Sequence, residues 1–199
     1  MRPFTEAEKY NFPLNPRSLC IDVGAYHGDW SREMSDKYHC RIDAYEPIKR
    51  FYDSTAKRLQ FLEKVRVYNL GVGALSGAQT MGVQNDSSGA FSGSQEVELC
   101  QVIAIAKAVK VAAVRFVDVL KLNCEGSEFA ILHELLTTKD EFGQAIERFR
   151  HIMVQFHQCV QAFEEKYNAI AGDLAQTHEL IWREPFVWEC WRLKQPAAG

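Results

Sequence analysis

The sequence predicts an α/β fold built on a mostly parallel, Rossmann-like sheet. Strand-like and helix-like segments alternate through the first seventy residues, a glycine turn follows the first strand, and two apolar runs near the C-terminus have the pattern of a hairpin. Alternation of this kind places successive strands side by side, joined by right-handed helical crossovers. The 199 residues suit a single domain, and neither an internal repeat nor a linker is recognisable.

The N-terminal third of the chain predicts the first half of the sheet. Residues 18–24 form an apolar run with β-branched members that stops at glycine, which indicates a buried strand. Residues 29–38 are polar and compatible with a helix, and residues 41–47 predict a second strand ended by proline. Apolar residues recur at helical intervals over 48–64, and residues 65–69 predict a third strand.

The middle of the chain has a different composition. Six glycines and many serines lie between Gly71 and Ser94, which favours a mobile loop, and we expect residues 82–95 to form a flexible, lid-like segment. Residues 97–114 are apolar with strand character and predict one or two short antiparallel ribbons.

Regular structure is predicted again in the C-terminal part. The expected elements are strands over 117–123 and 151–156, helices over 127–136 and 160–174, and a hairpin over 178–183 and 187–193. The expected division is an irregular arm of residues 1–17, one domain of residues 18–194, and a tail of residues 195–199.

Composition narrows the range of partners and compartments. The formal net charge of -3 supplies no basic field for phosphates, so we expect no nucleic-acid partner; a local basic patch is the alternative left open. The six cysteines lack CxxC spacing, which argues against a zinc site or a disulfide framework. There is no apolar leader and no run of about 18 apolar residues, so we expect a cytoplasmic protein with no membrane partner.

The turn after the first strand is the clearest candidate for a ligand site. A glycine there lets a ligand approach the backbone, and the turn presents free amide groups to it. The turn residues expected to contact the ligand are Asp22, Gly24, Ala25, Tyr26, His27 and Gly28. Glu46 follows the second strand, where an acidic side chain can accept hydrogen bonds from the two hydroxyls of a ribose. Together these features predict an adenosine-containing ligand.

Two cofactors match this pattern, a nicotinamide dinucleotide and S-adenosylmethionine. The dinucleotide prefers three glycines in the turn, and here Tyr26 stands at a position where a glycine is expected. Asp22 would also lie close to two phosphates, which is unfavourable. S-adenosylmethionine has no phosphate and carries an amino group that an acidic residue can meet, so the balance favours it over the dinucleotide.

Four strings in order resemble the FkbM family of S-adenosylmethionine-dependent methyltransferases. They are Cys20–Gly28 (CIDVGAYHG), Asp43–Pro47 (DAYEP), Asn69–Gly73 (NLGVG) and Asp118–Glu128 (DVLKLNCEGSE), and the match covers roughly residues 18–160. The resemblance implies a class I methyltransferase fold with a seven-stranded sheet. It also implies methylation of a hydroxyl on a small metabolite, sugar or polyketide-like acceptor. The alternative is a catalytically impaired relative that only binds the donor.

The resemblance also suggests individual roles. Pro47, Asn69 and Asn123 join the donor site, although Asn123 stands where the family usually has aspartate. Lys121 and Glu125 either bind the acceptor hydroxyl, or Lys121 pairs with Asp118 or Glu125 to hold a loop.

The candidate general base is His157, which follows the strand expected over 151–156. The alternative is a half-buried histidine bonded to a backbone carbonyl. We expect no metal; Asp118, Glu125 and His157 would be the ligands of a magnesium ion in a minor alternative.

Overall fold

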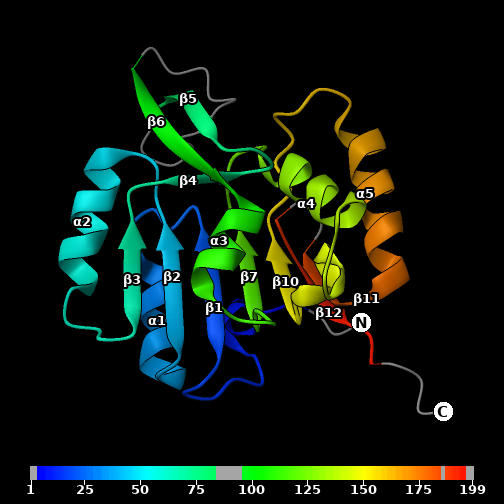
Figure 1. Cartoon of the computed structure of the whole chain (residues 1–199), viewed down its shortest axis with the longest axis horizontal. Coiled ribbons are helices and arrows are strands. Elements are labelled where there is room, and N and C mark those ends of the chain that lie inside the picture. Colours follow the sequence, from blue (N-terminus) through cyan, green and yellow to red (C-terminus); the bar gives the residue numbers. More distant parts are fainter. Residues whose placement is uncertain (1–3, 84–95, 185–186, 196–199) are drawn as a thin grey trace.

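A computed structural model of the chain describes residues 4–83, 96–184 and 187–195. Its centre is a seven-stranded sheet in the order β11-β12-β10-β7-β1-β2-β3 (Figure 1). The strands are β1 (Leu19–Val23), β2 (Arg41–Tyr45), β3 (Val65–Tyr68), β7 (Val119–Leu122), β10 (His151–Val154), β11 (His178–Glu184) and β12 (Trp188–Leu193). β1, β2, β3, β7 and β10 pair in parallel, and β12 is antiparallel to both of its neighbours. The predicted fold class, with its C-terminal antiparallel hairpin, is confirmed.

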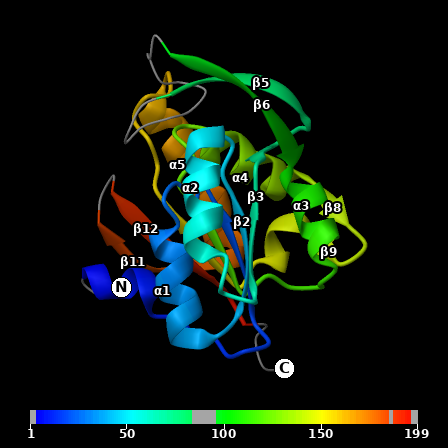
Figure 2. The same ribbon diagram turned by 90° about the vertical axis from the view of Figure 1, so that its left-hand side faces the viewer.

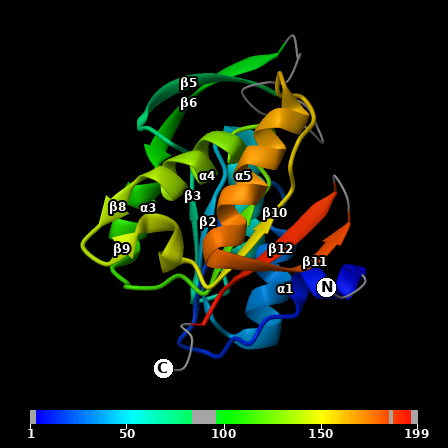
Figure 3. The same ribbon diagram turned by 90° about the vertical axis from the view of Figure 1, so that its right-hand side faces the viewer.

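Helices cover both faces of this sheet and complete a three-layer sandwich (Figures 2 and 3). α1 (Asp29–Tyr38) and α2 (Lys49–Leu59) lie on one face, and α3 (Ile105–Ala112), α4 (Glu128–Thr137) and α5 (Phe163–Thr177) lie on the other. The change of face occurs between β3 and β7, because the chain crosses β1 there and right-handed crossovers then place the following helices on the opposite side.

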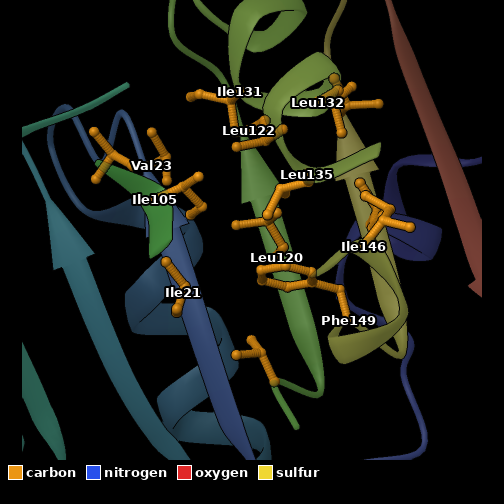
Figure 4. Close-up of a cluster of buried hydrophobic side chains, with 14 of the residues drawn as sticks. Ile21, Val23, Ile105, Leu120, Leu122, Ile131, Leu132, Leu135, Ile146 and Phe149 are labelled. Atoms are coloured by element: carbon orange, nitrogen blue, oxygen red, sulfur yellow. The ribbon is translucent and has the colours of Figure 1, made fainter. Parts of the chain in front are cut away.

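The core follows from the alternation of side chains along each central strand. Ile21 and Leu120 lie fully buried in a cluster that α3 and α4 cover (Figure 4). Cys20, the neighbour of Ile21, faces the other way and packs with Trp30 and Met34 of α1. Apolar residues on both faces explain why the central strands read as continuous apolar runs in the sequence.

A second, smaller sheet lies above the carboxyl ends of the central strands (Figure 1). β4 (Gly71–Gly73) pairs in parallel with β6 (Val97–Ala104), and β5 (Gly77–Gly82) pairs with β6 in antiparallel fashion. The expectation of a mobile loop over the first part of this region was therefore wrong for β4 and β5. The lid-like segment lies almost entirely outside the described residues, which resume at residue 96.

The expectation of ribbons over 97–114 holds only for its first half, because the second half is α3. The buried residues of α3 are Ile105, Ala108, Val109 and Ala112, which is the spacing of one helical face. A short apolar segment of this kind is ambiguous between strand and helix in sequence, and its packing on the main sheet decides in favour of the helix.

The N-terminal arm, expected to be irregular, packs on α1. It contains a short 3-10 helix, η1 (Glu6–Tyr10), and its Phe12 is buried. The indole Nε1 of Trp30 donates a hydrogen bond to the Lys9 carbonyl at 2.9 Å, and the Tyr38 hydroxyl accepts one from the Phe12 amide at 3.0 Å.

The remaining short elements lie between α4 and β10. They are β8 (Lys139–Asp140), β9 (Gly143–Gln144) and a second 3-10 helix, η2 (Ala145–Arg148). Among the described residues, no helix is both long enough and apolar enough to cross a membrane.

Candidate functional site

A cavity of about 90 Å³ lies at the carboxyl-terminal edge of the main sheet, where β1, β2 and β7 end. This is the edge at which open α/β sheets place their ligands. Six predicted site residues line it: Gly24, Tyr26, Glu46, Pro47, Asn123 and Glu125. The other predicted residues lie outside its lining and support it in ways that sequence alone did not show.

Gly24 permits a very close approach between the first turn and the end of β7. Its φ of +77° is left-handed, and a Cβ at this position would lie 1.9 Å from the Asn123 carbonyl oxygen. The amides of Gly24 and Ala25 both donate to the Tyr45 carbonyl at 3.0 Å, which fixes the turn against β2. Only glycine fits this position, because any side chain would separate the two backbones.

Gly28 and His27 are placed differently from the prediction. A Cβ on Gly28 would lie 2.8 Å from the Thr55 side chain, so this glycine serves the packing of the turn against α2. The His27 ring lies tilted against the Tyr26 ring, 3.8 Å between centroids, and meets the Phe51 ring edge-on at 5.5 Å. Of the two neighbouring residues expected to contact the ligand, Tyr26 therefore lines the cavity and His27 packs behind it.

Asp22 is fully buried and belongs to a network beneath the turn. Ser31 of α1 donates to Asp22 Oδ2 at 2.6 Å, and Lys121 Nζ lies 2.8 Å from Asp22 Oδ1 in an ion pair. Lys121 also donates to the Gly24 carbonyl at 2.7 Å. Of the two alternatives for Lys121, its pairing with Asp118 or Glu125 is therefore wrong; its ammonium group pairs with Asp22 and supports the turn from below, and binding of the acceptor hydroxyl by Lys121 stays a prediction.

Glu46 is buried at the end of β2, and both of its oxygens accept backbone hydrogen bonds. The Tyr26 amide donates to Oε2 at 2.8 Å, and the Ile48 amide donates to Oε1 at 2.9 Å. Burial raises the pKa of Glu46 to about 7, although the two amide donors oppose the shift. Asn69 supports the same turn, because its Nδ2 donates to the carbonyls of Glu46 and Pro47 at 3.1 and 2.9 Å.

The side-chain oxygen of Asn123 is a polar atom at the cavity that a ligand could still bind. Its Oδ1 is buried and has no hydrogen-bond partner among the residues that the structure describes. Leaving a buried amide oxygen unpaired is unfavourable by about 1–3 kcal/mol, so an N–H donor supplied by a ligand would be stabilised there. Glu46, on the other side of the cavity, offers lone pairs to hydroxyl donors.

Glu125, Glu128 and His157 form a cluster between the β7–α4 turn and the end of β10. Glu128 is fully buried; its Oε1 accepts from the His157 amide at 2.8 Å, and its Oε2 accepts from the Gly126 amide at 2.9 Å. The His157 ring nitrogens lie 3.2 Å from Glu128 Oε1 and 3.2 Å from Glu125 Oε1. The ring thus reaches the cavity only through Glu125.

The ionisation of His157 does not support the role of general base. Burial alone would lower its pKa, but hydrogen bonds to Glu125 and Glu128 outweigh burial and raise the pKa to about 9. At neutral pH the ring is therefore an imidazolium, which has no free lone pair for a proton. His157 instead neutralises the carboxylates and holds the turn that carries Glu125.

The minor alternative of a magnesium site loses its geometric basis. Asp118 lies at the opposite edge of the sheet, where it accepts from the Leu19 amide and pairs with Arg150. Among the described residues, no group of three or more His, Cys, Asp or Glu side chains is arranged to hold a metal ion.

The His157 cluster predicts a specific dependence of stability on pH. In the unfolded chain the pKa is 6.5 and in the folded chain about 9, so the stabilisation is complete below pH 6.5 and is lost as pH rises through 9. We expect the wild type to lose about 2–3 kcal/mol of unfolding free energy over this interval relative to His157→Gln. Urea unfolding of both proteins at several pH values measures this difference. A difference that does not change with pH would contradict the assigned ionisation, and exposed His133→Gln is the control.

Several cavity residues were missed by sequence reasoning. Phe51 lies on α2, Gly71 and Val72 on β4, and Met81 on β5. Met81 and Phe51 also belong to one apolar cluster that the small sheet buries. No local signal marks these residues as ligand contacts, because they reach the cavity only when the small sheet folds over the main one.

The strand order, the glycine turn and the acidic residue that ends β2 define the class I methyltransferase fold, which is the fold of S-adenosylmethionine-dependent methyltransferases. A protein provisionally described as an rRNA methylase of Clostridium thermocellum is similar, with a TM-score of 0.58 and 9% identity over 94% of this chain and 91% of that one. A precorrin-6y C5,15-methyltransferase of Geobacter metallireducens has a TM-score of 0.50 and 12% identity over 94% and 85%.

A third solved structure bears on the cofactor. It is a protein provisionally described as a methyltransferase of Streptococcus mutans, in complex with S-adenosylhomocysteine, with a TM-score of 0.52 and 8% identity over 91% of both chains. The neighbours thus agree with S-adenosylmethionine as the cofactor that this fold takes. No protein-family model and no curated protein matches the sequence, so the FkbM resemblance stays a prediction.

The expectation that excluded a nucleic-acid partner is corrected by the same neighbours. The Clostridium thermocellum protein, which shares this fold, is described as an rRNA methylase. A net charge averages over the whole surface and does not exclude a local basic region, so the formal charge of -3 was too coarse a basis for the exclusion.

Proposed function

We propose that this chain binds S-adenosylmethionine in the cavity at the end of β1, β2 and β7 and transfers its methyl group to an acceptor. One observation carries the proposal. The buried Glu46 carboxylate and the Asn123 amide oxygen, which has no hydrogen-bond partner among the described residues, line a single cavity at the carboxyl ends of β2 and β7, the strands on either side of β1. Two separate acceptors in one cavity suit a ligand with ribose hydroxyls at one end and an ammonium group at the other.

The residues present suit the two ends of this cofactor. Glu46 would accept hydrogen bonds from the ribose, and Asn123 Oδ1 and the Gly24 turn would receive the amino-acid end. Phe51 and Met81 supply an apolar wall for the purine. The cavity of about 90 Å³ is smaller than the roughly 300–1,000 Å³ of most ligand sites, so flexible Met81 has to move outward on binding.

The chain's own residues mainly have to position the reactants. Bound S-adenosylmethionine supplies an electrophilic methyl group on a positively charged sulfur. The backbone contact of Gly24 with Asn123 fixes where the cofactor's amino-acid end lies, and an in-line displacement depends on such alignment. A neutral amide at position 123 is compatible with this chemistry, because a fixed anion there would stabilise the charged ground state more than the transition state.

We further infer that the acceptor atom is a hydroxyl oxygen and that Glu125 accepts its hydrogen bond. Glu125 lines the cavity, whereas His157 is held as an imidazolium behind it. A carboxylate is an acceptor-only group and can receive the proton of an attacking hydroxyl. No observation at the site favours an impaired relative over an active enzyme, since Asn123 keeps an acceptor directed to bind a donor group.

Calorimetric titration tests the donor site directly. We expect one binding site for S-adenosylmethionine and for S-adenosylhomocysteine, and no heat of binding with NAD⁺. Saturating binding of NAD⁺ in place of the two adenosyl ligands would contradict the proposal. Transfer of a labelled methyl group to a panel of acceptors, oligoribonucleotides included, then tests turnover; binding without any transfer would favour the impaired relative.

A further inference from the structure

The edge of the main sheet opposite the cavity carries a row of cationic side chains. β1, β2, β3, β7 and β10 begin at this edge, as their parallel registers require, and antiparallel β12 ends there (Figure 1, lower edge of the sheet). A lysine or arginine lies close to each of these strand ends. We call this set the basic edge: Arg17, Arg41, Lys64, Arg115, Arg150 and Arg192.

Three of the six cationic side chains of the basic edge pair with carboxylates among the described residues, and the other three do not. The pairs with carboxylates are Arg41–Asp43 at 2.7 Å, Arg150–Asp118 at 3.1 Å and Arg192–Glu179 at 2.6 Å. Arg17, Lys64 and Arg115 have no carboxylate partner within the described part of the chain; Lys64 donates only to backbone carbonyls. A chain with a formal charge of -3 therefore concentrates uncompensated positive charge at one edge.

Arg115 also belongs to an alternating stack of guanidinium groups and aromatic rings. Its Cζ lies 5.1 Å from the Phe116 ring centroid and 5.5 Å from that of Phe142. Arg150 lies over Phe116 at 5.3 Å, and Arg148 lies over Phe142 at 5.1 Å. Arg115 is exposed and Phe142 is 44% exposed, so planar groups of both kinds are presented to solvent.

We propose that the basic edge and this stack bind a single-stranded nucleic acid. The uncompensated cations would contact successive phosphates, and unpaired bases would stack on the exposed faces of Arg115 and Phe142. Stacking of bases on aromatic rings and guanidinium planes, next to a cationic track for the backbone, is how proteins hold single strands without reading their sequence.

The stack is the observation that favours a nucleic acid over other anions. An acidic peptide would use the cations but has no planar groups for Arg115 and Phe142 to contact. An anionic membrane would need an apolar face to enter it, whereas the guanidinium groups of Arg115 and Arg148 both lie against the Phe142 ring. Exposed Phe61, which lies between α2 and Lys64, adds another aromatic ring at this edge.

This surface is distinct from the proposed methyl-donor site. The central strands have four or five residues, which separates the two edges by roughly 13–17 Å. The inference therefore does not rest on the proposed methyl transfer, and titration with S-adenosylmethionine should give the same affinity for wild type and for variants at the basic edge.

Fluorescence anisotropy with a labelled single-stranded RNA of about twenty nucleotides, and with DNA of the same sequence, tests the proposal. We expect both to bind, with affinity falling steeply from low to physiological salt. The double variant Arg115→Gln, Phe142→Ala should weaken binding roughly tenfold or more. Arg17→Gln, outside the stack, should weaken it less and reduce the slope of log affinity against log salt by about 0.7. All three substituted positions are exposed, and thermal unfolding verifies that each variant folds.

The matched control removes one cation and one exposed apolar side chain elsewhere, as Arg32→Gln with Leu75→Ala; Arg32 pairs with Asp36 and Leu75 is 77% exposed. Control binding equal to wild type supports the proposal. Absence of RNA and DNA binding at low salt would overturn it, and so would equal weakening by control and test variants. Equally tight binding of polyglutamate, or of phosphatidylserine vesicles, with the same sensitivity to the test variant would also overturn it.

Discussion

Replacing Glu46 with glutamine should raise the dissociation constant for S-adenosylmethionine by roughly 30-fold or more at about pH 8. Two ribose hydroxyls would lose a charged acceptor, and hydrogen bonds to charged groups contribute about 1.5–3 kcal/mol each. A loss of 2–4 kcal/mol corresponds to roughly 30- to 1,000-fold in affinity. Calorimetry measures it, with exposed Glu165→Gln as the control. Unchanged affinity in Glu46→Gln would show that the ribose site lies elsewhere.

The pH dependence of S-adenosylmethionine binding tests independently whether the ionised Glu46 carboxylate binds the ribose. Burial holds its pKa at about 7 in the free protein, and hydroxyl donors favour the ionised form. Wild-type affinity should therefore rise about tenfold from pH 6 to pH 8, and Glu46→Gln should lack this part of the change. The ligand's amino group titrates in both proteins, so their difference isolates the carboxyl group. A protonated Glu46 acting as donor would reverse the trend.

Replacing Gly24 with alanine should remove most of the stability of the fold. The new Cβ would lie 1.9 Å from the Asn123 carbonyl oxygen, and the φ of +77° is unfavourable for any L side chain. Relief requires β7 and the turn to separate, which would also break the contact of Lys121 with the Gly24 carbonyl. We expect a loss of more than about 3 kcal/mol in urea unfolding, or a protein that does not fold, with no donor binding.

Gly172→Ala is the matched control for this substitution. Gly172 lies within α5, and a Cβ there would have no neighbour within 4 Å. Alanine is the better helix former, so this variant should be more stable by about 0.5–1 kcal/mol. If Gly24→Ala proved as stable as wild type and still bound the donor, the turn would not lie against Asn123 as described.

The order of strands and helices could be predicted from sequence because each element has its own local pattern. Apolar runs, helical spacing and the glycine turn depend on neighbours in the chain, and they located β1, α1, β2, α2 and β3 within a few residues. Residues 71–83 and 105–112 were predicted poorly, because their structure depends on contacts with distant parts of the chain and not on a local pattern. β4 and β5 are rich in glycine and polar residues, which do not signal a strand. They become strands by pairing with β6, which lies further along the chain.

The sequence by itself determined the main sheet, the glycine turn and the position of the acidic residue after β2, because each of these depends on a short, contiguous stretch of residues. Tertiary structure alone decided which distant groups meet. It pairs Lys121 with Asp22 rather than with Asp118 or Glu125, and it encloses His157 between two carboxylates. The ionisation of a buried group depends on the charges and dipoles around it in space, which no local pattern encodes. That is why the expected base is an imidazolium, and why the pKa of Glu46 lies near 7.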